Sequence, residues 1–307
     1  MHTGTVYRST GSWYTVKSDA QFYDCRIKGR LRIAGIKSTN PVAVGDRVNF
    51  ELDASAPNQG IIYEVEDRRN YLVRKSVNLS KQTHILAANI DQLFLIVTLD
   101  NPPTHLPFID RFLVTVEAYG IQVVLVFNKA DTYDDIQKET LQERMALYTK
   151  IGYPCLLISA KNKQGIEEVR TRMQDKVSIV AGHSGAGKST LVNALDPTLE
   201  LATAEISEQH QQGQHTTTFA QMYDLEGHIK LIDTPGIKGF GVVEMSAQEL
   251  GDFFPEIFTL KSQCKYHNCL HVQEPQCAVR KAVEDHQIAP SRYQSYLQLL
   301  EEDTTYR

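Results

Sequence analysis

The first quarter of the chain alternates apolar and polar residues in short pieces. These pieces read GTVYRSTGSWYTVKS, FYDCRIKGRLRI, VAVGDRVNFEL and GIIYEVEDRRNYLVRKS, with Gly, Pro, Asn and Asp between them. Alternation with a period of two residues, broken by turn residues, predicts short half-buried strands. We therefore expect residues 1–75 to form a small all-β barrel of the OB-fold type. Its exposed face would either bind nucleic acid through basic and aromatic side chains or make protein contacts only, and the pattern leaves both open.

From residue 83 the period changes. The apolar runs IDQLFLIVTL, IQVVLVFN, CLLISA and KVSIVAG alternate with amphipathic stretches such as LPFIDRFLVTVEAYG and IQKETLQERMALYTKIG. This alternation predicts a mostly parallel α/β sheet, whose ligands bind at the carboxyl ends of its strands. After residue 245 the pattern becomes helical, interrupted by a cluster of cysteines. The expected fold is a multidomain α/β protein with domains at residues 1–75, 76–243 and 244–307.

Composition and charge fit a protein of several globular domains. The chain has 307 residues, of which 42% are hydrophobic and 22% charged. No run reaches the roughly 18 to 20 apolar residues of a membrane helix, and the start MHTGTVYRST lacks the apolar stretch of a secretory signal. We therefore expect a cytoplasmic protein. Residues 1–75 hold 12 Lys and Arg against 8 Asp and Glu, whereas the rest of the chain holds 20 against 29. The basic N-terminal region is therefore the candidate for nucleic-acid contact.

A phosphate-binding loop is predicted at GHSGAGKS. The stretch follows the strand-like run KVSIV and precedes the helix-like run KSTLVNAL, the context in which this motif cradles a triphosphate. Gly182 and Gly187 let backbone N–H groups turn toward the phosphates. The Lys188 side chain is expected to reach the two terminal phosphates and to act in catalysis. The hydroxyl group of Ser189 is expected to ligate Mg²⁺. The loop residues assigned to nucleotide binding are Gly182, His183, Ser184, Gly185, Ala186, Gly187, Lys188, Ser189 and Thr190.

Two further motifs select guanine. NKAD follows the strand-like run IQVVLVF, and its Asp131 carboxylate can accept hydrogen bonds from the guanine N1–H and 2-amino groups, which adenine lacks. A nucleotide with adenine would leave buried polar groups of the site unpaired, which disfavours its binding by roughly 10⁴-fold relative to the guanine nucleotide. The expected nucleotide is therefore GTP. SAK follows CLLI and would close over the base. The residues assigned to base recognition are Asn128, Lys129, Ala130, Asp131, Ser159, Ala160 and Lys161.

The order of these motifs is unusual. GTPases ordinarily run from the phosphate loop through a switch threonine and DxxG to NKxD and SAK, whereas here NKAD and SAK come first. Because domain termini often lie near one another, a chain can be joined there and cut elsewhere without losing its fold. The sequence therefore predicts a circularly permuted GTPase. Its DTPG segment, with Asp233 and Gly236 expected at the phosphate–Mg²⁺ end, leads directly into the cysteine-bearing region.

The sequence does not carry the usual residue that orients the attacking water. Ile237 stands where Ras-like proteins carry the glutamine that orients water. In GQHTTT, Thr216 or Thr217 is expected to ligate Mg²⁺. His215 beside them is a candidate to orient or activate water, with a purely structural or partner-binding role as the alternative.

The cysteine cluster predicts a structural zinc site. CKYHNCLHVQEPQC offers Cys264, Cys269, His271 and Cys277, separated by four, one and five residues. Three cysteines and one histidine make a typical tetrahedral zinc set, although this spacing is not that of a common finger. His267 is a competitor for His271.

Taken together, NKAD, SAK, GHSGAGKST, GQHTTT and DTPG, followed by CKYHNCLHVQEPQCAVRKAVEDHQIAPSRYQSYLQLL, resemble the bacterial ribosome small-subunit-dependent GTPase A family. The resemblance covers nearly the whole chain. It implies an OB-fold, a permuted GTPase domain and a zinc domain acting on the 30S subunit and its 16S rRNA late in assembly. It also implies slow GTP hydrolysis that the subunit accelerates, release of another assembly factor, His215 as candidate catalytic residue, and Cys264, Cys269, His271 and Cys277 as the zinc ligands.

The leading hypothesis is a monomeric GTPase that needs Mg²⁺ with GTP and one structural Zn²⁺. The main alternative is a GTP-gated RNA-binding module with incidental hydrolysis, which Ile237 favours. A P-loop kinase has less support, since no phosphoacceptor site is visible.

Overall fold

The N-terminal strands close into a barrel. The computed structural model describes residues 1–29, 40–54, 56, 58–75, 83–199, 220–234 and 245–305. The barrel strands pair in the order β1-β2-β3-β5-β4, and β1 also pairs with β4, which closes the barrel. Its core includes Val6, Val16, Phe50 and Ile62, the inward positions of the alternating pattern. The strands are β1 (His2–Ser9), β2 (Tyr14–Ser18), β3 (Gln21–Ile27), β4 (Arg47–Leu52) and β5 (Gln59–Val65).

A second strand set forms the predicted α/β sheet. Its order is β10-β9-β8-β11-β13-β12, with all neighbours parallel except β12 and β13. The strands are β8 (Gln92–Val97), β9 (Gln122–Phe127), β10 (Cys155–Leu157), β11 (Val177–Gly182), β12 (Gln221–Leu225) and β13 (Ile229–Asp233). β12 also pairs with β1 through Gln221 and Arg8, so the barrel and this sheet are continuous.

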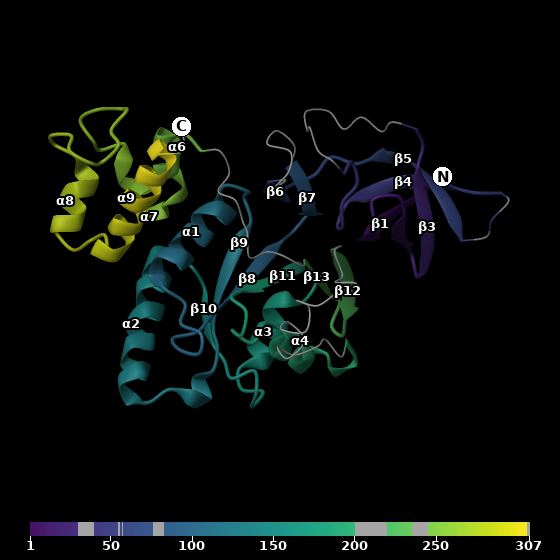
Figure 1. The fold of residues 1–307 in the computed structure, drawn as a ribbon, viewed down its shortest axis with the longest axis horizontal. Coiled ribbons are helices and arrows are strands. Elements are labelled where there is room, and N and C mark those ends of the chain that lie inside the picture. The colour runs from purple at the N-terminus through teal and green to yellow at the C-terminus, as the bar shows by residue number, and fades with distance from the viewer. Residues whose placement is uncertain are drawn as a thin grey trace.

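Helices cover both faces of the α/β sheet (Figure 1). α1 and α2 bury apolar side chains on one face, and α3 and α4 do so on the other. The helical segments here are α1 (Leu106–Glu117), η1 (Ala130–Thr132), α2 (Asp135–Ile151), α3 (Ile166–Met173), α4 (Lys188–Leu195) and η2 (Pro197–Leu199). The change of period thus corresponds to a layered α/β sheet, whose first strand in the chain is β8.

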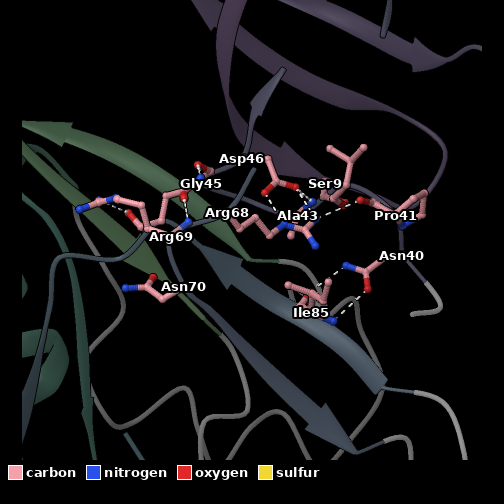
Figure 2. Close-up of polar contacts among 12 residues, drawn as sticks. Ser9, Asn40, Pro41, Ala43, Gly45, Asp46, Arg68, Arg69, Asn70 and Ile85 are labelled. Carbon is pink, nitrogen blue, oxygen red and sulfur yellow. Dashed lines mark hydrogen bonds and ion pairs between the residues drawn. The ribbon is translucent and has the colours of Figure 1, made fainter. Parts of the chain in front are cut away.

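A polar junction fastens the barrel to the α/β region (Figure 2). β6 (Tyr71–Lys75) pairs with β7 (Thr83–Ala88) rather than with the barrel strands. Asn40 makes two hydrogen bonds with the backbone of Ile85, at 2.8 and 2.9 Å. The Arg68 guanidinium donates to both carboxylate oxygens of Asp46 at 2.7 Å, and both side chains are buried. The junction is thus held by hydrogen bonds from the Asn40 side chain to the β7 backbone and by a desolvated ion pair.

The C-terminal region packs several helices around the cysteine cluster. They are α6 (Ala247–Leu250), η4 (Gly251–Phe253), α7 (Pro255–Lys261), α8 (Ala278–Glu284) and α9 (Pro290–Thr305). Arg292 of α9, 1% exposed, binds Asp110 of α1 at 2.8 Å and Glu256 of α7 at 2.6 Å. This region is therefore tied directly to the α/β sheet's covering helix. Among the described helices, none is long and apolar enough to cross a membrane.

Candidate functional site

The sheet order brings the predicted motifs together despite their reversed order along the chain. β9 leads into NKAD, β10 into SAK, β11 into the phosphate loop, and β13 ends at Asp233. These four strands are parallel, together with β8, so their carboxyl ends meet at one edge of the sheet. The permutation therefore leaves the motifs at the same edge, where the predicted GTP site would lie.

The phosphate loop has the backbone that its glycines predict. Gly182, Gly185 and Gly187 adopt positive φ values of 146°, 79° and 100°. A Cβ at Gly187 would lie 2.3 Å from Asn128 Nδ2, and one at Gly182 would lie 2.7 Å from the Ile96 carbonyl oxygen. Only glycine meets both the φ and the space requirement here.

The other loop residues are arranged around this backbone. Ser184 is exposed and Ala186 buried, while Ser189 and Thr190 lie half-buried in the first turn of α4. The Lys188 ammonium donates to the carbonyl oxygens of Gly182 at 2.8 Å and His183 at 2.6 Å. The positive charge of Lys188 therefore lies directly at the loop, where phosphate groups would bind.

Asn128 connects the three loops. Its buried side chain donates from Nδ2 to the Ala186 carbonyl oxygen at 2.9 Å, and its Oδ1 accepts from the Ala160 N–H at 3.0 Å. One amide side chain thus pairs a buried acceptor of the phosphate loop with a buried donor of SAK. Because unpaired buried groups are costly, Asn128 fixes the relative position of both loops.

The other residues predicted to recognise the base lie in the same two loops, NKAD and SAK. The buried Ser159 hydroxyl donates to Asp131 Oδ1 at 2.6 Å and accepts from the Asn162 N–H at 3.2 Å. Lys129 adopts a left-handed conformation with φ of 68°, and its ammonium donates to the Asn101 carbonyl oxygen. Ala130 is half-buried and Lys161 exposed. Asp131, which is exposed, is thereby oriented but left open toward a ligand.

Asp233 lies at the end of β13, at the same edge of the sheet as Lys188. Its carboxylate reaches the surface, but protein encloses its other sides and this desolvation raises its pKa, an effect that the Lys188 charge opposes. Gly236, His215, Thr216 and Thr217 lie outside the described residues.

Sequence reasoning missed several contributors to this edge. The buried Tyr133 hydroxyl donates to the Asn128 carbonyl oxygen at 2.6 Å and accepts from the Leu99 N–H at 3.0 Å. The loop after β8 approaches the phosphate loop, since Pro102 Cδ lies 3.2 Å from where a Cβ on Gly185 would stand. The His183 ring lies 3.9 Å from the Phe108 ring, centroid to centroid. Tyr133 two residues after NKAD is a visible signal, but a tyrosine there equally suits a core position.

The four predicted zinc ligands converge. Their ligand atoms all lie within 4.8 Å of one another. Cys264 Sγ lies 3.9 Å from Cys277 Sγ, and His271 Nδ1 lies 3.6 and 3.4 Å from these two sulfurs. A tetrahedral ion with Zn–S bonds of about 2.3 Å would place its sulfurs about 3.8 Å apart, so the donor set and the spacing fit Zn²⁺.

The surroundings of the cluster fix its histidine. His271 is 3% exposed, and its carbonyl oxygen accepts from the Tyr293 hydroxyl at 2.5 Å. Glu274 accepts from the Leu270, Val272 and Gln273 N–H groups and so orders the loop between the ligands. His267 is exposed and outside the cluster. The choice of His271 over His267 therefore agrees with the geometry.

Comparisons with known proteins agree with this architecture. Residues 65–243 match the RsgA GTPase family and residues 3–62 the RsgA N-terminal domain. The chain is 58% identical over 307 residues, 99% of this chain and 98% of the relative, to the small ribosomal subunit biogenesis GTPase RsgA of Christiangramia forsetii. It is 59% identical over 306 residues, 98% and 93% of the two chains, to the protein of the same name from Flavobacterium johnsoniae.

Two solved structures are also similar. YjeQ from Thermotoga maritima is 32% identical, with a TM-score of 0.82 and coverage of 100% of this chain and 99% of that one. YloQ, described as a circularly permuted GTPase, is 29% identical, with a TM-score of 0.77 and coverage of 100% and 96%. The permuted order of motifs, the barrel and the matches over the full chain lead to one conclusion: the chain belongs to the RsgA GTPase family.

Proposed function

We propose that this protein binds GTP with Mg²⁺ and hydrolyses it in response to the 30S ribosomal subunit, and that hydrolysis drives a late step of small-subunit maturation. The observation that carries the proposal is the assembly of NKAD, SAK and the phosphate loop around the buried Asn128 side chain. The names of the relatives supply the partner, since both are small ribosomal subunit biogenesis GTPases.

Each motif has a role in this proposal. Asp131 reads the guanine edge, and the Ser159 hydroxyl holds its carboxylate in place. Lys188 and the loop N–H groups bind the phosphates, while Ser189, Asp233, Gly236 and one of Thr216 and Thr217 serve the Mg²⁺ and γ-phosphate end. When bound, Mg²⁺ neutralises charge that develops on the phosphates. His215 orients the attacking water, in the place of the glutamine that Ile237 replaces.

The flanking domains supply the partner contacts. The barrel carries exposed aromatic and basic side chains, including Phe22 at 50% exposure and Arg26 stacked on Trp13 at 3.9 Å, which suit contact with 16S rRNA. Cys264, Cys269, His271 and Cys277 hold one structural Zn²⁺, which stabilises the C-terminal region. We further propose that the protein is a cytoplasmic monomer and that hydrolysis promotes release of another assembly factor.

The test is GTP turnover by the purified protein, alone and with 30S subunits. We expect strong stimulation by the subunit that is lost in Lys188→Ala and in His215→Ala. Unstimulated turnover with intact GTP binding would instead support the GTP-gated binding module, which the family membership does not favour. Stimulation that survives in His215→Ala would remove that residue from the chemistry while leaving the rest of the proposal standing.

A further inference from the structure

A polar cleft lies between the barrel and the β12–β13 hairpin. It has a volume of about 610 Å³, and its lining comes from β1, β2, β4 and the hairpin. The charged side chains of the lining are Lys17, Asp19, Arg47, Asp224 and Lys230, and Tyr7 and His228 add polar groups. Three of these side chains are cations and two are carboxylates, so the lining carries a small net positive charge that favours an anionic ligand.

Asp224 of β12 is held from the barrel side of this cleft. The Tyr7 hydroxyl donates to Asp224 Oδ1 at 2.6 Å, and the Lys17 ammonium donates to Asp224 Oδ2. Burial and the neighbouring Asp224 carboxylate raise the pKa of Tyr7, so the hydroxyl keeps its proton and remains a donor. The ion pair is partly open to solvent, with exposed fractions of 27% for Lys17 and 38% for Asp224. Exposed pairs are weak, so a phosphate group can compete for the Lys17 ammonium.

The strand that carries Asp224 is the link between barrel and nucleotide site. Gln221 of β12 pairs on one side with Arg8 of the barrel and on the other with Asp233. Arg8, Gln221 and Asp233 therefore lie on three successive strands at one level of the sheet. This pairing gives a continuous backbone connection from the barrel to Asp233.

The other attachment of the barrel is more deeply buried. Asp46 and Arg68, at 0% and 4% side-chain exposure, form the buried pair of the junction (Figure 2). Gly45 is so close to Ala88 that a Cβ would lie 2.0 Å from its carbonyl oxygen. The junction is therefore buried and closely packed, whereas the Lys17–Asp224 contact is partly open to solvent.

We propose that the cleft binds the phosphate backbone of RNA, and that this RNA takes Lys17 from Asp224 and so releases β12 from the barrel. The proposal rests on the function proposed above and adds a site and a route for its regulation. Lys17, Arg47 and Lys230 contact the phosphates, while Tyr7 and Asp224 form the restraint that the ligand relieves. In the free protein this restraint keeps GTP turnover low.

The test of the restraint needs only GTP. Asp224→Asn keeps the size of the side chain but removes its charge, and we expect basal turnover without subunits to rise about three- to tenfold, in keeping with the modest strength of an exposed pair. Asp135→Asn is the matched control, because Asp135 forms an exposed ion pair with Lys138 on α2. Basal turnover of Asp224→Asn equal to that of the wild type would overturn the restraint, whether or not 30S subunits stimulate the wild type.

The test of the ligand uses a fluorescent single-stranded oligoribonucleotide of mixed sequence. We expect Lys17→Met and Lys230→Met each to weaken its binding about three- to tenfold and to reduce its salt dependence, as loss of a phosphate contact does. Lys138→Met should bind as the wild type does. RNA should also raise wild-type turnover more than it raises that of Asp224→Asn. Equal effects of the oligonucleotide and of inorganic phosphate, or unchanged RNA affinity in both lysine variants, would overturn the assignment to RNA.

Discussion

Replacement of Asn128 by alanine tests how the nucleotide loops are held together. The substitution removes two hydrogen bonds, at 2.9 Å to the Ala186 carbonyl oxygen and at 3.0 Å from the Ala160 N–H. Both groups belong to buried residues. An unpaired buried backbone group costs about 1–3 kcal/mol, so the two together cost about 2–6 kcal/mol in the closed site.

This cost should appear in nucleotide affinity. Each 1.4 kcal/mol is about a tenfold change in Kd, so we expect Asn128→Ala to weaken binding of fluorescent GDP by about 30-fold or more. The matched control is Asn162→Ala, because Asn162 is exposed and contributes its backbone N–H to Ser159. Affinity of Asn128→Ala within threefold of the wild type, with the fold intact by circular dichroism, would refute the idea that Asn128 joins the loops.

Three further predictions concern stability. Arg292→Leu leaves Asp110 and Glu256 without their buried cation, so it should lower the free energy of unfolding by about 3–5 kcal/mol in denaturant titrations. The control is Arg111→Leu, which breaks a half-exposed pair with Glu302 and should lower it by less than about 1 kcal/mol. If the cluster holds zinc, a chelator should lower the thermal midpoint of the wild type and of Cys155→Ala, but should have no further effect on Cys277→Ala, which lacks one of the four predicted ligands. Equal sensitivity of all three proteins would exclude a metal at the cluster. Burial and the nearby charges of Lys188 and His105 lower the pKa of His183 below its ordinary value of 6.5. The folded state therefore binds fewer protons than the unfolded state, so the free energy of unfolding should fall as the pH drops below about 6.5. His183→Asn should flatten that decline and the exposed His286→Asn should not.

Local motifs made much of this structure predictable. The phosphate loop, NKAD and SAK each need particular residue types at fixed spacing, because backbone conformation and ligand chemistry act within a few residues. Gly182 and Gly187 at positive φ bear out that reasoning. The two strand periods also separated the barrel from the α/β sheet, because burial on one face and burial on both faces leave different patterns.

Contacts between distant segments were not predictable in the same way. Tyr133 binds the Leu99 N–H across 34 residues, and Tyr7 binds Asp224 across 217. Neither has a local signature, since a buried tyrosine in a strand or after a loop also suits ordinary packing. The assignments of His215, Thr216, Thr217 and Gly236, the domain boundaries and the ligand roles of the loop residues remain predictions.

The central claim is that GTP hydrolysis is coupled to the small subunit, and such coupling requires the bound nucleotide to change the affinity for the subunit. Its most direct test is cosedimentation of the protein with 30S subunits in the presence of a non-hydrolysable GTP analogue or of GDP. A coupled GTPase should bind at least about tenfold more tightly with the analogue, the scale of a typical coupling between two sites. Equal binding with both nucleotides, by a protein shown to be loaded with each, would contradict the account.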